Sequence, residues 1–363
     1  MKKDIDDRLA NSDFYYQVGD YKTFSKNECF VLTKGDASKI TFHQQHRIWD
    51  AVDLTKEPEQ SFESLCNEIC RRYRERYDHI CLWLSAGFDS QTILISFMRS
   101  GVLIDEIGFH DRSDYYEDSE IPYILQSIKI YKEFFNPNLK VSRVKLDAKY
   151  YKKFYSQYAD KVWFHGPGNS LKYAKSAANY VHNFHDDVLR LKTQYNRVDL
   201  FGKEKPRLDL RDGKWYMQSN DLVYFDSMGA PVECFFCTDV LPELHVKQVH
   251  MAIRFFESLP ELSHELVHKI QSHEPQYYER WNLGVGRVPI QHPESRDGSI
   301  KMNFANKFDS KDATNIIKYL EKREVDNFFG TRQDLFNYTG IQETDLNQII
   351  FGKDWYIRDR REK

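Results

Sequence analysis

Residues 82–94, with the sequence LWLSAGFDSQTIL, combine an apolar run typical of a buried strand with a short polar turn and the start of a helix. In a parallel sheet, ligands bind beyond the carboxyl ends of the strands, where the next helix presents unpaired backbone N–H groups and the positive end of its dipole. Hydroxyls can donate hydrogen bonds there, small residues let the backbone approach a ligand, and a carboxylate can hold Mg²⁺. The turn therefore predicts a phosphate-binding loop. Its residues are Ser85, Ala86, Gly87, Phe88, Asp89 and Ser90.

The flanking sequence predicts the parallel sheet that such a loop needs. Apolar residues at helical spacing indicate a helix over residues 61–77, before the strand at 79–85. A second helix follows the loop and ends at Gly101, a residue type common just after helix C-termini. Strands and helices that alternate in this way are typical of an α/β, Rossmann-like fold with a parallel sheet and flanking helices. Further strands are expected at residues 104–110, 140–147 and 197–202.

The ends of the chain differ from this central pattern. Residues 14–46 alternate like short strands, and a Lys-Gly-Asp turn divides them, so we expect a small β-rich N-terminal leader over residues 1–58. The nucleotide-binding domain is expected over 59–240, with a hairpin-like GKWYMQ near its end. The sequence from 241 to 363 predicts a mostly helical C-terminal region.

The turn SAGFDS resembles the SGGxDS loop of the PP-loop ATP pyrophosphatase superfamily, which cleaves ATP between the α and β phosphates. The resemblance implies ATP and Mg²⁺ as cofactors, with the loop hydroxyls and Gly87 on the departing pyrophosphate and Asp89 on the metal. Ala86 replaces the first glycine of the pattern, which adds strain if that position requires a positive φ. The other common nucleotide loop, GxxxxGK[ST], is excluded because no lysine follows the glycine.

The segment RRYRERYDHICLWLSAGFDS is similar to the start of the synthetase domain in asparagine-synthetase-like proteins, and especially in small phage-type PP-loop proteins without a glutaminase domain. This resemblance implies that the chain adenylates a carboxylate or carbonyl, which an amine then attacks. No cysteine follows Met1, so ammonia would come from solution or from a partner, unless the nucleophile is another amine. The acceptor, the nitrogen source and the oligomeric state are not predicted.

Three further groups are candidate parts of this site. HGPGNSLKYA occupies the position of a second glycine-rich loop in asparagine synthetases, and equally fits a simple turn. Cations after the strand at 197–202 can meet phosphate charge, or form a solvated basic loop. The adenine is placed near the end of the strand at 104–110 by analogy alone. The residues of the three groups are Gly166, Gly168 and Asn169; Lys203, Lys205 and Arg207; and Gly108 and Phe109.

Two short motifs support other functions. HELVH at residues 264–268 matches HExxH, in which two histidines one helical turn apart bind zinc in metalloproteases; the alternative is a solvated helix face. A third ligand would come from Glu274, Glu279 or His273. CFFC, with Cys234 and Cys237, indicates either buried thiols or the paired cysteines of a PP-loop sulfur transferase, for which the acceptor would be a tRNA.

The overall composition sets the remaining limits. A net charge of −3 gives no sign of a nucleic-acid-binding protein as a whole, although a local basic strip remains compatible with it. No apolar run is long enough for a membrane span, so we expect a cytoplasmic protein, in the host cytoplasm if a phage encodes it. The six cysteines suit reduced thiols. A non-catalytic nucleotide-binding protein is a further alternative.

Overall fold

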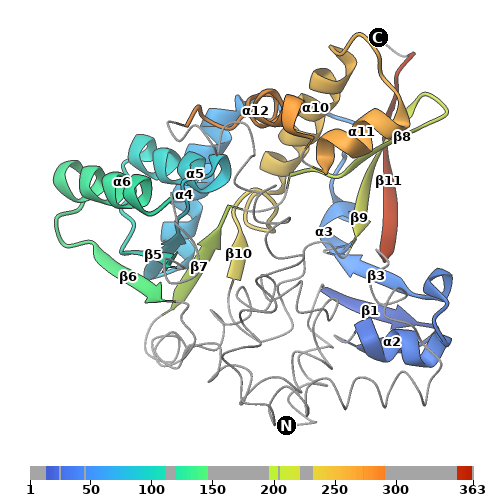
Figure 1. Cartoon of the computed structure of the whole chain (residues 1–363), viewed down its shortest axis with the longest axis horizontal. Helices are drawn as coiled ribbons and strands as arrows, with labels where there is room; N and C mark the ends of the chain where they lie inside the picture. The colour runs from blue at the N-terminus through green and yellow to red at the C-terminus, as the bar shows by residue number, and fades with distance from the viewer. Residues whose placement is uncertain are drawn as a thin grey trace.

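The computed structural model describes residues 14–23, 26–44, 46–111, 120–145, 196–202, 205–220, 232–272, 274–290 and 350–361. These residues form three sheets with helices packed around them (Figure 1). The predicted positions Gly166, Gly168, Asn169 and Lys203 lie outside the described residues.

The central sheet has five parallel strands in the order β10-β7-β4-β5-β6. The chain moves from β4 toward one edge through β5 and β6, and then continues on the other side of β4 with β7 and β10. The direction of winding therefore reverses between β4 and β7, and in open α/β sheets this is where ligands bind. The predicted α/β fold is confirmed. The strands are β4 (His79–Trp83), β5 (Glu106–Asp111), β6 (Lys140–Lys145), β7 (Arg197–Phe201) and β10 (Val232–Cys234).

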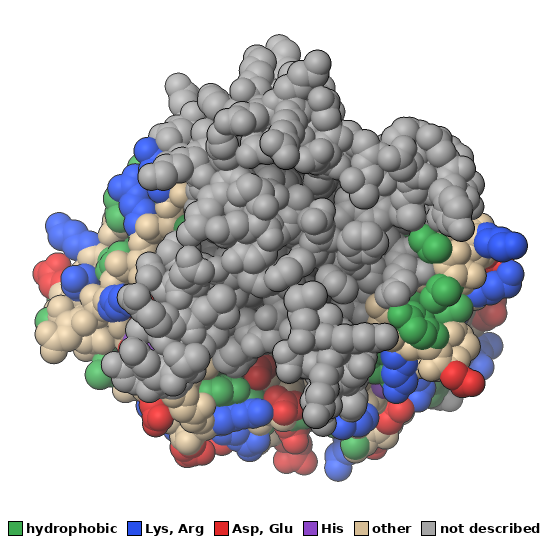
Figure 2. Space-filling model, turned by 90° about the horizontal axis from the view of Figure 1, so that it is seen from below, with side chains coloured by type: hydrophobic (Ala, Val, Ile, Leu, Met, Phe, Trp, Pro, Cys, Tyr) green, Lys and Arg blue, Asp and Glu red, His purple; other side chains and the backbone are tan. Residues whose placement is uncertain are grey.

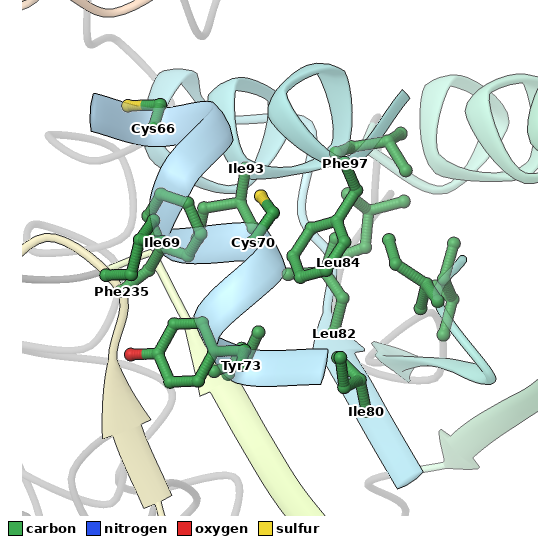
Figure 3. Close-up of a cluster of buried hydrophobic side chains, with 14 of the residues drawn as sticks. Cys66, Ile69, Cys70, Tyr73, Ile80, Leu82, Leu84, Ile93, Phe97 and Phe235 are labelled. Carbon is green, nitrogen blue, oxygen red and sulfur yellow. The ribbon is translucent and has the colours of Figure 1, made fainter. Parts of the chain in front are cut away.

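One face of this sheet is covered by helices α4 (Phe62–Arg76) and α5 (Phe88–Ser100), with α6 (Glu120–Phe134) against β5. Because side chains alternate along a strand, every second residue of β4, β5 and β7 enters the apolar core on this side. The hydroxyl of Ser61 caps α4 by accepting from the Ser64 amide at 3.1 Å, and Gly101 ends α5 in the left-handed conformation, as predicted. Figure 3 shows α4 contributing Cys66, Ile69, Cys70 and Tyr73 to the core around Ile80, Leu82, Ile93 and Phe97.

The opposite face of the sheet carries buried charges. The Arg197 guanidinium donates to Glu106 Oε2 at 2.7 Å and to Asp199 Oδ1 at 2.8 Å, and its side chain is 1% exposed. Burial raises the pKa of Glu106, but hydrogen bonds from His79 and Ser142 and the charge of Arg197 outweigh that effect and hold it well below its usual range. The Arg197–Glu106 ion pair therefore joins β7 to β5 across β4, in addition to the backbone ladders.

A second sheet, which is antiparallel, lies beside the C-terminal helices (Figure 1). Its strands β8 (Leu208–Arg211), β9 (Lys214–Asn220) and β11 (Phe351–Asp359) pair in the order β11-β9-β8. The β8–β9 hairpin matches the one predicted from GKWYMQ, whereas β11 is a strand within a region expected to be mostly helical. The helices of that region are α10 (Pro242–Glu257), α11 (His264–Gln271) and α12 (Pro275–Gly284).

The N-terminal leader is a three-stranded antiparallel sheet in the order β2-β1-β3. Its strands are β1 (Phe14–Val18), β2 (Tyr21–Thr23) and β3 (Thr41–Gln44), followed by α3 (His46–Ala51). The prediction of strand for residues 29–33 was wrong, because they belong to helix α2 (Lys26–Thr33), which a 3₁₀ turn (Ala37–Lys39) follows. A short apolar run fits either structure, and here Cys29 and Phe30 enter the core from a helix.

In the described part of the chain, no helix has the length and apolarity needed to span a bilayer. On the surface seen in Figure 2, the described Lys and Arg side chains are interspersed with Asp and Glu.

We expect Glu106→Gln to lower the free energy of unfolding at pH 7 by about 3 kcal/mol or more, because Arg197 then loses one of its two buried carboxylate partners. Folding lowers the pKa of Glu106, so its contribution is complete above the unfolded pKa of about 4.5 and is lost as the pH falls below that value. Chemical unfolding of the wild type and the variant from pH 7 to pH 3 measures this difference.

The control is Glu68→Gln, because Glu68 forms exposed ion pairs with Arg71 and Arg72 and should change stability by less than about 1 kcal/mol. A difference in the free energy of unfolding between the wild type and Glu106→Gln that stays constant from pH 7 to pH 3 would contradict the role assigned to this carboxylate.

Candidate functional site

The predicted loop lies between β4 and α5, at the carboxyl end of the central strand. Its shape is set by Ser90, whose hydroxyl accepts from the Ser85 amide at 3.0 Å and lies 2.9 Å from both the Ser85 carbonyl and the Ser85 hydroxyl. The Gly87 amide donates to the Ser85 hydroxyl at 3.2 Å, and the Gln91 carboxamide donates to the Ser85 carbonyl. Ser90 is 4% exposed and closes the loop from inside, while Ser85 is only partly buried. Of the two serines, Ser85 is the better placed for a ligand.

Ala86 does not strain the loop. The residues with positive φ among the described positions are Lys34, Asp212 and five glycines, so Ala86 adopts an ordinary backbone conformation. Its methyl group is buried in the core beneath the sheet, together with Leu84 and Ile93. The strain considered for alanine at this position is therefore absent, and its methyl group contributes to packing.

The end of β7 presses against the start of α5. A Cβ atom added at Gly202 would lie 2.6 Å from the Ser90 amide nitrogen and 2.7 Å from the Asp89 carbonyl carbon. Only glycine permits this approach without movement of the backbone. Gly202 could not be recognised from the sequence alone, because a glycine after a strand is also an ordinary turn signal. Its contact places the loop directly at the reversal point between β4 and β7.

Two cations converge on Asp89 at the first turn of α5. Lys205 Nζ donates to Asp89 Oδ2 at 2.9 Å, and Arg287 Nε donates to Asp89 Oδ1 at 2.6 Å. The Asp89 and Lys205 side chains are each 15% exposed, whereas the Arg287 side chain is fully buried. The carboxylate thus has one solvent-accessible cationic partner and one fixed partner, next to a helix N-terminus that attracts anions.

Arg287 is a candidate site residue that the sequence analysis missed. It follows Gly286, 198 positions after Asp89, in a loop that has no motif and follows no strand. Its guanidinium carbon lies 3.5 Å above the ring of Phe236, and its Nη1 donates to the Val285 carbonyl at 3.2 Å. The next residue is tied to α5 through a hydrogen bond from the Val288 amide to the Thr92 hydroxyl at 3.0 Å. Only the folded chain brings this arginine to the loop.

The other predicted site residues occupy different surroundings. Arg207 donates to the Gln271 carbonyl of α11 at 3.1 Å, so it braces that helix, while Lys205 reaches the loop. Gly108 and Phe109 lie within β5, which ends at Asp111; a Cβ on Gly108 would lie 2.8 Å from the Trp83 ring, and Phe109 is 1% exposed in the core. The strand thus extends beyond the residues chosen for adenine.

The end of β5 carries an aromatic row instead. The Trp83 ring lies between His110 and Phe201, with ring centroids 5.4 and 5.9 Å away and small interplanar angles. Its indole nitrogen donates to Asp199 at 3.1 Å. His110 is therefore the residue at this strand end that a planar ligand could meet, next to the loop.

The two alternative motifs have distinct positions. Cys234 and Cys237 are 8% and 4% exposed, and the phenylalanines between them are fully buried, as expected for CFFC in a core. The HELVH histidines lie on α11 beside β8, where both approach Asp209. Among the described residues, Asp209 groups with the two histidines, whereas Glu274 and Glu279 do not belong to this group; His273 lies outside the described residues.

Comparisons with known proteins add little to this geometry. No family model matches the chain, and no curated protein matches it. Among solved structures, one match is the NH3-dependent NAD synthetase from Campylobacter jejuni subsp. jejuni NCTC 11168 in complex with the nitrate ion. It shares 13% identity over 64% of this chain and 97% of that chain, with a TM-score of 0.31, which is too low to transfer fold or activity. The strand order and the loop define the class: an α/β protein with a strand-loop-helix turn at the reversal point of a parallel sheet, the position that the SAGFDS motif requires.

We expect Gly202→Ala to lower the free energy of unfolding by about 1–3 kcal/mol, because the added methyl group overlaps the backbone of Asp89 and Ser90. The matched variant in the same loop is Gly87→Ala, whose added Cβ meets only the Ser85 hydroxyl at 3.3 Å and should cost less than about 1 kcal/mol. Denaturant unfolding of both variants makes the comparison. Equal losses in the two proteins would contradict the close approach of β7 to the loop.

Proposed function

We propose that the chain is a PP-loop-type enzyme that uses ATP to adenylate a carboxylate or carbonyl oxygen, which an amine then displaces, as asparagine-synthetase-like proteins do. The observation that carries the proposal is the position of SAGFDS: it forms the loop after the central strand, at the reversal point of the sheet and at the N-terminus of α5. A motif found in the structural context that its chemistry requires is much stronger support than the motif alone.

The proposed reaction has two steps. An oxygen of the acceptor attacks the α phosphorus of ATP, the bond from that phosphorus to the α–β bridging oxygen breaks, and pyrophosphate leaves with the bond electrons. An amine then attacks the activated carbon, and AMP leaves with the acceptor oxygen while the amine loses a proton. Negative charge develops on the departing pyrophosphate, so the helix N-terminus and a nearby cation would lower the barrier.

Lys205 is the cation best suited to that role. Its side chain is 15% exposed and ends at Asp89 Oδ2, and because a lysine side chain can exchange partners it could turn to a phosphate oxygen. Arg287 is fully buried and stays with Asp89 Oδ1. The two cations therefore have different proposed roles, one in contact with phosphate and one in positioning the carboxylate.

Asp89 fits the expected magnesium ligand. Mg²⁺ prefers carboxylate oxygens and commonly binds through one or two of them together with substrate phosphates. Oδ1 is fixed by the buried arginine, so Oδ2 is the oxygen that would turn to the metal when Lys205 leaves it. Bound Mg²⁺ would neutralise phosphate charge next to the loop.

The sulfur-transfer alternative is disfavoured by burial. A reactive thiolate needs an accessible, electropositive environment, whereas both CFFC thiols lie within a hydrophobic cluster that includes Trp49 and Val246. A non-catalytic nucleotide-binding protein would use the same loop but release no AMP, so product analysis separates it from the proposed enzyme.

We expect Mg·ATP with a suitable acceptor and amine to yield AMP and pyrophosphate, and Lys205→Met to lower the rate by about 100-fold or more, as is typical for loss of one charge-stabilising donor. Asp89→Asn should also lose activity, with the folded fraction followed by circular dichroism because this change leaves a buried arginine without its charge partner. Nucleotide products are separated by anion-exchange chromatography, with panels of carboxylates and amines as substrates.

The matched control is Lys132→Met, a lysine substitution in α6 away from the loop, which should retain the wild-type rate. Release of ADP in place of AMP, or wild-type rates in folded Lys205→Met and Asp89→Asn proteins, would contradict the proposed reaction.

We expect the double substitution Cys234→Ser and Cys237→Ser to cost about 1–3 kcal/mol for each buried hydroxyl left without a partner, while AMP release per folded molecule persists. Circular dichroism measures the folded fraction and chromatography the AMP. A folded double variant that releases no AMP, or a brown protein after anaerobic purification, would instead support sulfur transfer to a tRNA.

A further inference from the structure

The HELVH motif forms a three-residue cluster with a buried carboxylate. His264 and His268 lie one turn apart on α11, and both Nε2 atoms face Asp209 Oδ1 of β8, at 3.0 and 3.5 Å. The three potential ligand atoms all lie within 4.8 Å of one another. The imidazoles are 50% and 44% exposed, whereas the Asp209 side chain is 6% exposed. The cluster thus has a buried carboxylate on its inner side and two solvent-accessible imidazoles on its outer side.

The carboxylate oxygen in this cluster lacks a hydrogen bond. Asp209 Oδ1 is a buried atom without a hydrogen-bond partner in the described structure, although a histidine nitrogen lies 3.0 Å away, because neither ring is aligned to donate to it. The other oxygen, Oδ2, is paired with Arg211 at 2.8 Å. A buried acceptor left without a donor is costly, which indicates that another positive group belongs at Oδ1.

The spacing of the ligand atoms suits a tetrahedral metal ion. Zinc binds histidine nitrogen and carboxylate oxygen at about 2.0–2.1 Å, so two ligands of a tetrahedral site lie about 3.3 Å apart. The two measured separations from Asp209 Oδ1, 3.0 and 3.5 Å, lie on either side of this value. Zinc would contact Oδ1 and both nitrogens at once, whereas neither imidazole is aligned to donate a hydrogen bond to Oδ1.

We propose that Asp209, His264 and His268 form a zinc site that joins α11 to β8, with water as the fourth ligand on the exposed side. Two imidazoles and one carboxylate are a donor set that zinc favours over Mg²⁺ or Ca²⁺, which prefer oxygen ligands alone. Arg211 holds the second oxygen of the carboxylate and so orients the ligand from outside the metal shell.

The proposed zinc site lies next to the segment that reaches the phosphate-binding loop. Strand β8 begins at Leu208, three residues after Lys205 and one after Arg207. Leu208 already exchanges two backbone-to-side-chain hydrogen bonds with Gln271 of α11, at 2.7 and 2.8 Å. Zinc would add a stronger link between the same two elements, so that α11 and β8 hold the Lys205 segment in place. This inference is independent of the proposed ATP chemistry.

The test uses the full chain without a histidine tag, stripped with a chelator and dialysed. Titration with zinc chloride by calorimetry, and metal analysis after gel filtration, should show one zinc per chain. Cobalt(II) should give the visible absorption of a tetrahedral site. His264→Gln changes a half-exposed residue and should retain the fold, and it should weaken zinc binding by at least about 100-fold, since loss even of an outer contact costs 10–100-fold.

Two further variants define the ligand set. Asp209→Asn should weaken zinc binding to a similar extent, while Glu265→Gln, a change at the exposed neighbour of His264 in the same motif, should leave the affinity unchanged. Zinc should also raise the melting temperature of the wild type and of Glu265→Gln, but not of His264→Gln. The proposal is overturned if the wild type binds no stoichiometric zinc, if folded His264→Gln and Asp209→Asn bind it normally, or if Glu265→Gln loses it.

Discussion

The contact between Gly202 and the first turn of α5 is the constraint on which the rest of the site depends. It brings the end of β7 within contact of the backbone at Asp89 and Ser90, so that the loop after β4 opens at the point where the sheet reverses its winding. The chain that leaves Gly202 then carries Lys205 to Asp89. A larger residue at position 202 would separate the strand from the helix and move the lysine away from the carboxylate.

The charges around the loop are arranged in two layers with different exposure. Arg287 is buried between Phe236 and Asp89 and fixes one carboxylate oxygen, while Lys205 occupies the accessible side. A buried, hydrogen-bonded arginine has little freedom to move, whereas a lysine can exchange partners. This arrangement keeps one carboxylate oxygen in place, and in the proposed reaction Lys205 and Oδ2 would separate to meet an anionic ligand and its metal.

Much of the fold could be predicted because the sequence patterns that indicate it lie within single elements or short turns. The strand-loop-helix pattern, the end of α5 at Gly101 and the β8–β9 hairpin depend on periodicity and on glycine positions, which a single sequence displays. The helix α2 was missed because a short apolar run has no distinctive period, and β11 because its partner β9 lies more than 130 residues away. The leader's core also includes Ile350, from the other end of the chain.

The residues of the candidate sites also divide into those that a local motif marks and those that only the folded chain reveals. Ser85, Gly87, Asp89 and Ser90 could be selected from their motif, although the role of Ser90 in closing the loop required the hydrogen bonds of the folded chain. No sequence motif marked Arg287, or Asp209 of the proposed zinc site, since each becomes relevant only through a partner distant in sequence.

The loop after β4 is proposed to bind the phosphates of ATP. The most direct measurement is titration of ¹⁵N-labelled protein with pyrophosphate and Mg²⁺, followed by amide NMR. We expect saturable shifts concentrated at residues 85–90 and Gly202; unchanged loop amides at millimolar pyrophosphate would contradict the account.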